Sequence, residues 1–318
     1  MLKLFARRGL ELLVTLFLVS LVTFFFTSKL PGSEAAVICG SAGRACLRKE
    51  DAILYLNHPF FARYFHWLGN LLSGTLGYSA APRQPISTIL SSAYPVTLEL
   101  VIYSQIIAIL LAIPLAMWSA VRPNRLFDRI STAGTFATLA LPVFIIGPLL
   151  RYFFSVQLTI FPGTASTLPS IASNPLQNLN VMFLPSLTLA IGSIAVYQRL
   201  LRADMIATLE QDFIVMARAK GLTTRRILFR HALRPSTFGV VTVGGLQIGS
   251  LIVGAIIAEQ VFGLTGIGSD LVAAVTKNDL PTVQVITLVV AVVYIVLNLL
   301  IDLLYTVIDP RVRRARAT

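Results

Sequence analysis

Long apolar runs alternate with short basic segments along this chain of 318 residues. A helix needs about 20 apolar residues to cross a bilayer. The runs long enough are Leu10–Ser28, Thr97–Trp118, Thr132–Phe154, Val181–Gln198, Thr237–Ala258 and Pro281–Ile308. The third contains Pro142, Gly147 and Pro148, residue types that membrane helices tolerate where neighbouring groups satisfy the freed carbonyls. The pattern predicts an all-α integral membrane protein with six transmembrane helices.

The first run follows Lys3, Arg7 and Arg8, as the apolar core of a signal peptide would. Such a core is only about 7–15 residues long, however. We therefore expect an uncleaved first helix. The chain then divides into an N-terminal segment with that helix (1–28), an extracytoplasmic loop (29–94), a five-helix core (95–308) and a basic tail (309–318).

Basic residues gather on one side of the predicted membrane. They lie before the first run, in the loops 119–131 and 199–236, and in the tail, whereas the short opposite loops carry only Lys277. Cytoplasmic loops are enriched in Lys and Arg, while long loops such as 29–94 translocate regardless of their charge. We expect a multi-pass protein of the cell (inner) membrane with both termini in the cytoplasm.

Composition agrees with a membrane protein, since 56% of the residues are hydrophobic and 13% are charged. A soluble domain has about 25% charged residues. The formal net charge of +12 raises nucleic acid as a partner. The charges lie between apolar runs rather than on a soluble basic face, so we expect membrane lipid and no nucleic acid.

The loop 29–94 holds the two cysteines of the chain, Cys39 and Cys46. They are either two free thiols or a local disulfide, and an oxidising compartment favours the disulfide. Metal sites usually need three or four ligands. No nearby histidine completes such a set, so we expect no metal.

A helix is predicted at Phe60–Ser73, because Pro59 suits the start of a helix. Its aromatic residues Phe60, Phe61, Tyr64, Phe65 and Trp67 suit a membrane–water interface. Two roles stay open for this helix. It packs on the outer ends of the spans, or it binds a partner.

Motifs for catalysis or nucleotide binding are missing from the sequence. It contains no HExxH, no GxSxG and no GxxxxGK[ST]. Acidic residues are rare in the predicted spans, with Glu99 and Glu259 near outer ends and Asp302 near an inner end. A proton-driven carrier or a cation channel usually has acidic groups at mid-depth. We expect no enzyme activity and no cofactor bound by this chain, so either energy comes from a partner or no solute is pumped.

The fifth run contains Gly245 and Gly249 in a GxxxG pattern, which permits close backbone approach. Close packing within the chain is the favoured interpretation. A pore-lining or subunit-facing role is the alternative, for which Gln247 and Glu259 are further candidates. A glycine-rich turn is predicted at Glu259–Asp270.

The loop between the fourth and fifth runs contains the polar stretch Glu210–Pro235. Asp212 is expected to cap a helix at Phe213–Lys220, and Gly221 is suited to end it with a positive φ. This loop is either a docking surface or a segment attracted to anionic lipid headgroups. These residues alone support the two interpretations equally.

A family resemblance separates the two interpretations. ARAKGL (Ala217–Leu222) and RHALRP (Arg230–Pro235) resemble the cytoplasmic loop of ABC importer permeases, most closely the first permease subunit of the dipeptide/oligopeptide/nickel importers. Further matching segments are LPGSEA (Leu30–Ala35), GTLGYS (Gly74–Ser79), YPVTLEL (Tyr94–Leu100), LALPVF (Leu139–Phe144), LPSLTLAIG (Leu184–Gly192), EQVFGLTGIG (Glu259–Gly268), NDLPTVQ (Asn278–Gln284) and NLLIDLLYTVIDPRVR (Asn298–Arg313).

The resemblance implies that the loop is a coupling helix seated in a cleft of an ATPase subunit. Its residues are Asp212, Ala217, Arg218, Ala219, Lys220, Gly221 and Leu222, of which Ala217, Gly221 and Leu222 match the family signature. Val215 and Met216 stand where the general signature has Glu and Ala. Pro235 and Ser236 stand where Asn and Ala are common, and Thr75 replaces an Asp of the outer motif.

The resemblance also implies partners. They are a homologous second permease, two ATPase subunits that hold ATP and Mg, and an extracytoplasmic solute-binding protein. Peptides are the expected solute, with nickel or another small solute as the alternative. A passive channel is the rival from another functional class.

Overall fold

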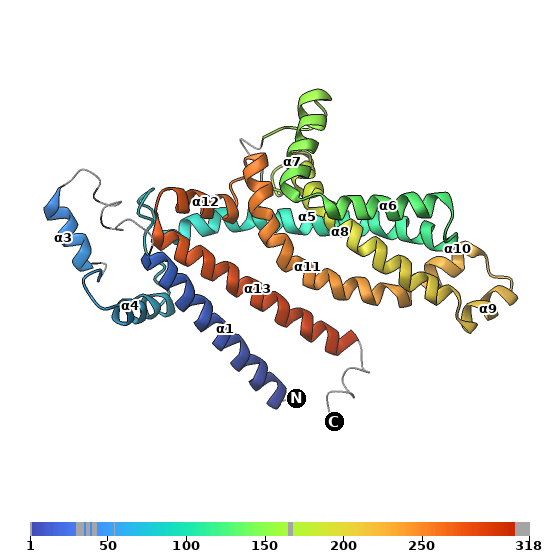
Figure 1. Ribbon diagram of the computed structural model, residues 1–318, viewed down its shortest axis with the longest axis horizontal. Helices are drawn as coiled ribbons and strands as arrows, with labels where there is room; N and C mark the ends of the chain where they lie inside the picture. The colour runs from blue at the N-terminus through green and yellow to red at the C-terminus, as the bar shows by residue number, and fades with distance from the viewer. Residues whose placement is uncertain are drawn as a thin grey trace. The chain divides into compact units, whose positions relative to one another are not determined.

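The computed structural model describes residues 2–29, 35, 39, 43–53, 55–164 and 168–308 (Figure 1). The elements are α1 (Leu2–Lys29), α3 (Arg44–Ile53), α4 (Phe60–Leu72), α5 (Ile86–Val121), α6 (Leu126–Ala140), α7 (Val143–Arg151), the π-helix η1 (Tyr152–Gln157), α8 (Pro175–Leu209), α9 (Asp212–Ala219), α10 (Thr224–Arg226), the π-helix η2 (Ile227–Ala232), α11 (Leu233–Phe262), α12 (Ile267–Thr276) and α13 (Leu280–Ile308). The chain forms two compact units. The first comprises Met1–Val96 and Thr265–Val296, and the second comprises Thr97–Leu264 and Leu297–Thr318.

Five helical stretches are long and apolar enough to cross a membrane within these ranges: Gly9–Lys29, Ile86–Val121, Pro175–Leu209, Thr224–Phe262 and Leu280–Ile301. The predicted all-α membrane fold is therefore confirmed. Six spans result if α6 and the α7–η1 stretch form one broken span, so the count of six stays a prediction.

The span predicted at Thr132–Phe154 is not one continuous helix in the structure. Leu126–Ala140 and Val143–Gln157 meet at an angle of 106°. The break falls at Leu141 and Pro142, which both have extended backbone. Proline cannot donate a backbone hydrogen bond, and its ring disfavours the helical conformation for the residue before it. The proline thus ends α6 instead of kinking it.

The helices are longer than the apolar runs that predicted them. α5 begins at Ile86 rather than Thr97, and α8 extends from Pro175 to Leu209. Hydropathy reports the membrane-embedded part of a helix, whereas backbone hydrogen bonding continues through its polar ends. The predicted turn from Glu259 is corrected for the same reason: α11 continues to Phe262 and ends at Gly263, which has a φ of 68°.

Small residues bring helices of the second unit close together. Ala108, Ala112, Ala116 and Ala120 recur along one face of α5 and are buried in a cluster with residues of α8 and α11. Small side chains allow membrane helices to approach closely. α8 also packs against α6, α7 and α11, and Figure 1 shows α6, α8 and α11 running along one another.

A buried carboxylate organises part of the first unit. Asp279, just before α13, accepts hydrogen bonds from the Ser79 hydroxyl, from the Ala80 N–H at 3.0 Å and from the Thr282 hydroxyl at 2.9 Å. Gln284 Nε2 also donates to Thr27 Oγ1 at 2.7 Å, which joins α13 to α1. The segment before α5 is thereby held to the start of α13.

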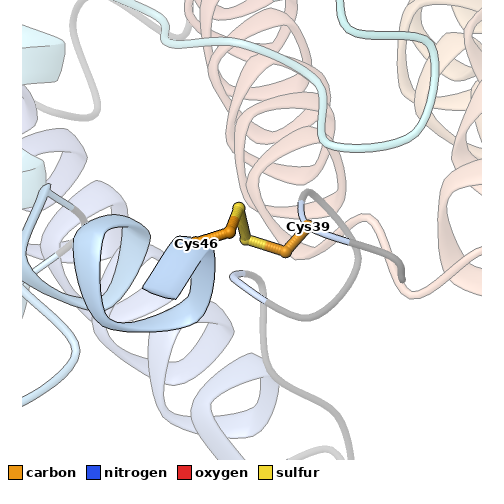
Figure 2. Close-up of a disulfide and its surroundings, with 2 residues drawn as sticks. All are labelled: Cys39 and Cys46. Atoms are coloured by element: carbon orange, nitrogen blue, oxygen red, sulfur yellow. A yellow bond between two sulfur atoms is a disulfide. The ribbon is translucent and has the colours of Figure 1, made fainter. Parts of the chain in front are cut away.

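Cys39 and Cys46 are joined by a disulfide (Figure 2), with Cys46 at the start of α3. We expect that a thiol-alkylating reagent adds no mass to the unreduced, denatured chain and adds two groups after reduction. The chain has no other cysteine, so intact-protein mass spectrometry gives an unambiguous result. Alkylation without reductant would contradict the pairing.

Candidate functional site

The short helix α9 ends in a glycine cap built by the sequence ARAKGL. Gly221 has a φ of 74°, as the sequence predicts. The Gly221 N–H donates to the Arg218 carbonyl at 2.9 Å, and the Leu222 N–H donates to the Ala217 carbonyl at 3.3 Å. This pair of bonds is the Schellman motif, which satisfies the last carbonyls of a helix. Ala217, Gly221 and Leu222, the residues that match the family signature, therefore each take part in this helix end.

Three buried apolar side chains hold α9 against the following segment. Ile214 and Ala217 of α9 form a cluster with Ile227 of η2, and Leu209 and Leu222 pack against it. Leu222 follows the glycine and reaches back toward Ala217, as the hydrophobic contact of a Schellman motif does. The position of α9 on its loop is therefore fixed by packing as well as by the cap.

The rest of α9 exposes apolar side chains. Phe213, Val215 and Met216 are 47%, 58% and 59% exposed. Exposed apolar patches bordered by polar residues mark interaction sites. Arg218 and Lys220 supply exposed charge at the C-terminal end of the same helix. Sequence reasoning noted Val215 and Met216 only as departures from a signature and did not single out Phe213.

The predicted capping role of Asp212 is wrong. Gln211 occupies the cap position, with no side-chain cap hydrogen bond, and Asp212 is the first residue of α9. Gln211 has the extended backbone that a cap requires, whereas Asp212 is already helical. The carboxylate of Asp212 lies at the positive end of the helix dipole instead.

The ends of the two long helices that flank α9 are joined to each other. The hydroxyls of Thr208 at the end of α8 and Ser236 in α11 form a hydrogen bond of 3.1 Å. Gly239 is close to α8 as well, since a Cβ there would lie 2.7 Å from Asp204 Oδ2. The loop with α9 thus connects the C-terminal end of α8 to the N-terminal end of α11, and these two ends are in contact.

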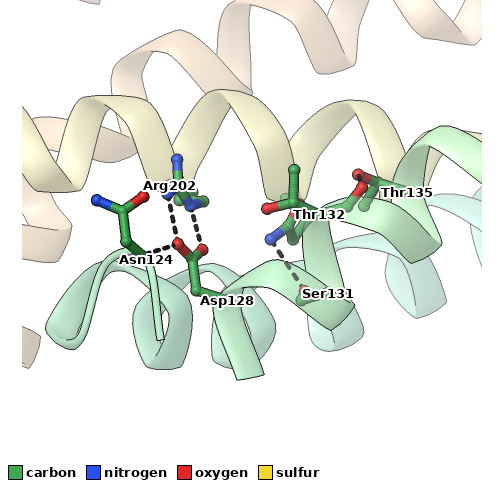
Figure 3. A network of polar contacts seen from close by, with 7 residues as sticks. Asn124, Asp128, Ser131, Thr132, Thr135 and Arg202 are labelled. Atoms are coloured by element: carbon green, nitrogen blue, oxygen red, sulfur yellow. Dashed lines mark hydrogen bonds and ion pairs between the residues drawn. The ribbon is translucent and has the colours of Figure 1, made fainter. Parts of the chain in front are cut away.

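An ion pair joins α8 to α6 near the same end (Figure 3). The Arg202 guanidinium donates from Nε to Asp128 and from Nη2 to Asp128 Oδ2 at 2.6 Å. The Asn124 N–H donates to the same Oδ2 at 2.7 Å. Asp128 is only 2% exposed. One turn further along, Gln198 Nε2 donates to Ser131 Oγ at 3.1 Å. Arg202 belongs to the basic loop 199–236 by sequence, and its pairing with Asp128 was not predicted.

The glycine pair of α11 lies in tight packing. A Cβ on Gly245 would come within 2.8 Å of Ile301 in α13, and Gly249 is buried. Gly245 therefore packs against a helix of its own chain, as the favoured interpretation predicts. Gln247 is half-buried and accepts from the Ser250 hydroxyl.

Glu259 does not lie in a turn but is fully buried inside α11. Thr97 Oγ1 donates to its carboxylate at 2.6 Å. Near this end of the second unit, Arg151 Nη1 donates to the Val261 carbonyl at 2.6 Å. A cation at the C-terminal carbonyls of a helix is favourable.

The predicted coupling residues and the glycine pair occupy different parts of the second unit, on and just after α9 and in α11. Within the part of the chain described above, no three His, Cys, Asp or Glu side chains lie close enough together to hold a metal ion.

Comparison with known proteins gives a family match along almost the whole chain. Residues 112–314 match the family described as "Binding-protein-dependent transport system inner membrane component". Residues 1–101 match "Binding-prot-dependent transport system membrane comp, N-term".

Curated relatives and a solved structure agree with that match. The glutathione transport system permease protein GsiC of Escherichia coli O6:H1 (strain CFT073) is 34% identical over 314 residues, which cover 98% of this chain and 99% of that protein. The oligopeptide transport system permease protein AppB of Bacillus subtilis (strain 168) is 33% identical over 309 residues, covering 96% and 98%. A chain of the MetNI methionine ABC transporter, solved in an inward-facing conformation, has a similar fold, with a TM-score of 0.54, 15% identity, and coverage of 70% of this chain and 97% of that one. The chain therefore belongs to the family of binding-protein-dependent transport system inner membrane components and is a permease subunit of an ABC importer.

Proposed function

We propose that Asp212–Leu222 is the coupling segment through which ATPase subunits drive this permease. The observation that carries the proposal is the two-sided character of α9. Ile214 and Ala217 fix it to its own loop, while Phe213, Val215 and Met216 present an exposed apolar surface. An apolar surface in an otherwise basic loop matches an apolar cleft on a partner better than it matches lipid headgroups.

The connections of α9 supply a route for movement. A push on α9 acts on the ends of α8 and α11, because Thr208 and Ser236 join them. The Asp128–Arg202 pair makes α6 follow α8. Such a group of helices moves as a unit between two states, and ATP on the ATPases and the loaded binding protein stabilise different states.

In this proposal the complex contains a homologous second permease, two ATPase subunits and an extracytoplasmic binding protein. ATP and Mg bind to the ATPases, and this chain has no catalytic activity of its own. It crosses the inner membrane six times with both termini in the cytoplasm, and the loop with α9 faces the ATPases. The basic residues of that loop support this orientation.

Short peptides are the proposed solute. The names of the two relatives, one for glutathione and one for oligopeptides, share that chemical class. The binding protein delivers the solute, so the permease needs only a path that admits it.

Reconstitution tests the proposal. We expect liposomes with the complete complex and the binding protein to take up labelled glutathione or an oligopeptide only when ATP is supplied. A complex with hydrolysis-deficient ATPase subunits is the matched control and should take up neither. Uptake by the permease alone, without ATPases, would identify a passive channel and contradict the proposal.

A further inference from the structure

The helix α4 carries apolar side chains on two of its three faces. At 3.6 residues per turn, one face comprises Phe60, Tyr64, Trp67 and Leu71, and the adjacent face comprises Phe61, Phe65, Leu68 and Leu72. The third face contains the polar side chains Arg63, His66 and Asn70. A helix that packs on one neighbour in water needs only one apolar face, so the second apolar face requires an explanation.

The first face packs on α1, which lies in the same unit. Phe24 contacts the rings of Phe60, Tyr64 and Trp67 at centroid distances of 5.5, 5.6 and 5.5 Å. Tyr64 is fully buried, and its hydroxyl forms a 2.8 Å hydrogen bond with Ser20 Oγ. α4 therefore crosses α1 at Phe24, and Figure 1 shows it beside the C-terminal end of α1.

This crossing places α4 at membrane depth. α1 is a candidate span from Gly9 to Lys29. Phe24 lies five residues before Lys29, which is about 7 Å along a helix axis, and Ser20 lies about 13 Å before it. Half of the hydrocarbon core is about 15 Å thick. Amphipathic helices in a leaflet bury their apolar face about 5–10 Å below the headgroups, which is the depth of the crossing point.

The second face is exposed and continues the exposed apolar surface of α1. Phe61, Phe65 and Leu72 are 64%, 59% and 80% exposed. Ring contacts lead from Phe61 to Phe60 at 5.3 Å and from Phe60 to Phe25 at 5.9 Å. Phe25 is itself exposed on the candidate span. The two helices thus share one aromatic surface.

We propose that α4 is embedded in the leaflet at the C-terminal end of α1, with Phe61, Phe65, Leu68 and Leu72 among the lipid acyl chains. The face with Arg63, His66 and Asn70 is directed toward headgroups and water. The helix then anchors the disulfide-bonded segment before it to the membrane surface. The proposal depends on the membrane assignment and not on the coupling role of α9, so either can fail without the other.

Spin labels on α4 test the proposal in the assembled complex, in nanodiscs of phosphatidylethanolamine and phosphatidylglycerol. Single cysteines replace Phe61, Phe65 or Leu72 on the apolar face and His66 or Asn70 on the polar face. Leu110→Cys, at an exposed position of the α5 span, is the lipid reference. The native cysteines form a disulfide, and a second series with Cys39→Ser and Cys46→Ser excludes thiol exchange.

We expect labels at 61, 65 and 72 to collide with oxygen more than with a water-soluble nickel complex, as the label at 110 does. Labels at 66 and 70 should show the reverse preference. Labels at 61, 65 and 72 that are shielded from both reagents would mean that a protein partner covers this face. Preference for the nickel complex there would mean that it faces water. Either result overturns the proposal.

Discussion

Gly221→Trp abolishes ATP-dependent uptake while the chain still inserts and accumulates in the membrane. Gly221 has a φ of 74°, and no atom lies within 4 Å of a Cβ built on it. A side chain at this position therefore has open space at its Cβ. The left-handed backbone costs roughly 1–2 kcal/mol for a residue with a side chain, which leaves the buried cluster of Ile214, Ala217 and Ile227 in place.

The expected loss thus comes from obstructed docking and not from unfolding. Gly221→Asn is the matched control, since Asn tolerates this backbone conformation and is small. We expect it to retain most of the uptake. Copurification of the ATPases with each variant, at equal expression, measures docking directly. Normal uptake by Gly221→Trp would contradict the coupling assignment.

Asp128→Ala destabilises the second unit by about 3 kcal/mol, the lower end of the range for removing one member of a buried ion pair. The substitution leaves the Arg202 guanidinium without its carboxylate and the Asn124 N–H without its acceptor. The Arg202 side chain is 23% exposed, and water compensates part of the loss. Tryptophan fluorescence during heating of the detergent-solubilised chain measures the shift in unfolding temperature.

The control for this prediction replaces both partners. Asp128→Leu combined with Arg202→Met leaves no unpaired charge, and apolar replacements of buried ion pairs are often neutral or stabilising. We expect the double variant to unfold nearer to the wild-type temperature than Asp128→Ala does. Equal unfolding temperatures for Asp128→Ala and the wild type would show that the pair does not join α6 to α8.

The helix end within the proposed coupling segment could be predicted from the sequence because its main features are local. A glycine after ARAK predicts a left-handed residue and a helix end, and Gly221 provides both. The exposed surface of α9 could not be predicted in the same way. Phe213 and Met216 are as hydrophobic as core residues. Only the packing of Ile214 and Ala217 shows which face of α9 is exposed.

Charges were the least predictable part of the chain. Arg202 fits the positive-inside pattern, yet it pairs with Asp128, which lies 74 residues away. Pairing across such a separation depends on how α6 and α8 align, which hydropathy does not report. Glu259 was misplaced for a related reason, because the end of an apolar run does not mark the end of a helix.

The sequence by itself determined the class of the molecule, since apolar length and the distribution of basic residues follow from the cost of burying charge and backbone in lipid. It also determined the family and the helix end at Gly221, where the coupling segment is proposed. Only the tertiary structure decided that Asp128 pairs with Arg202 and that Phe213, Val215 and Met216 remain exposed. These features depend on contacts between distant segments, and the free energy of such contacts is set by packing rather than by local pattern.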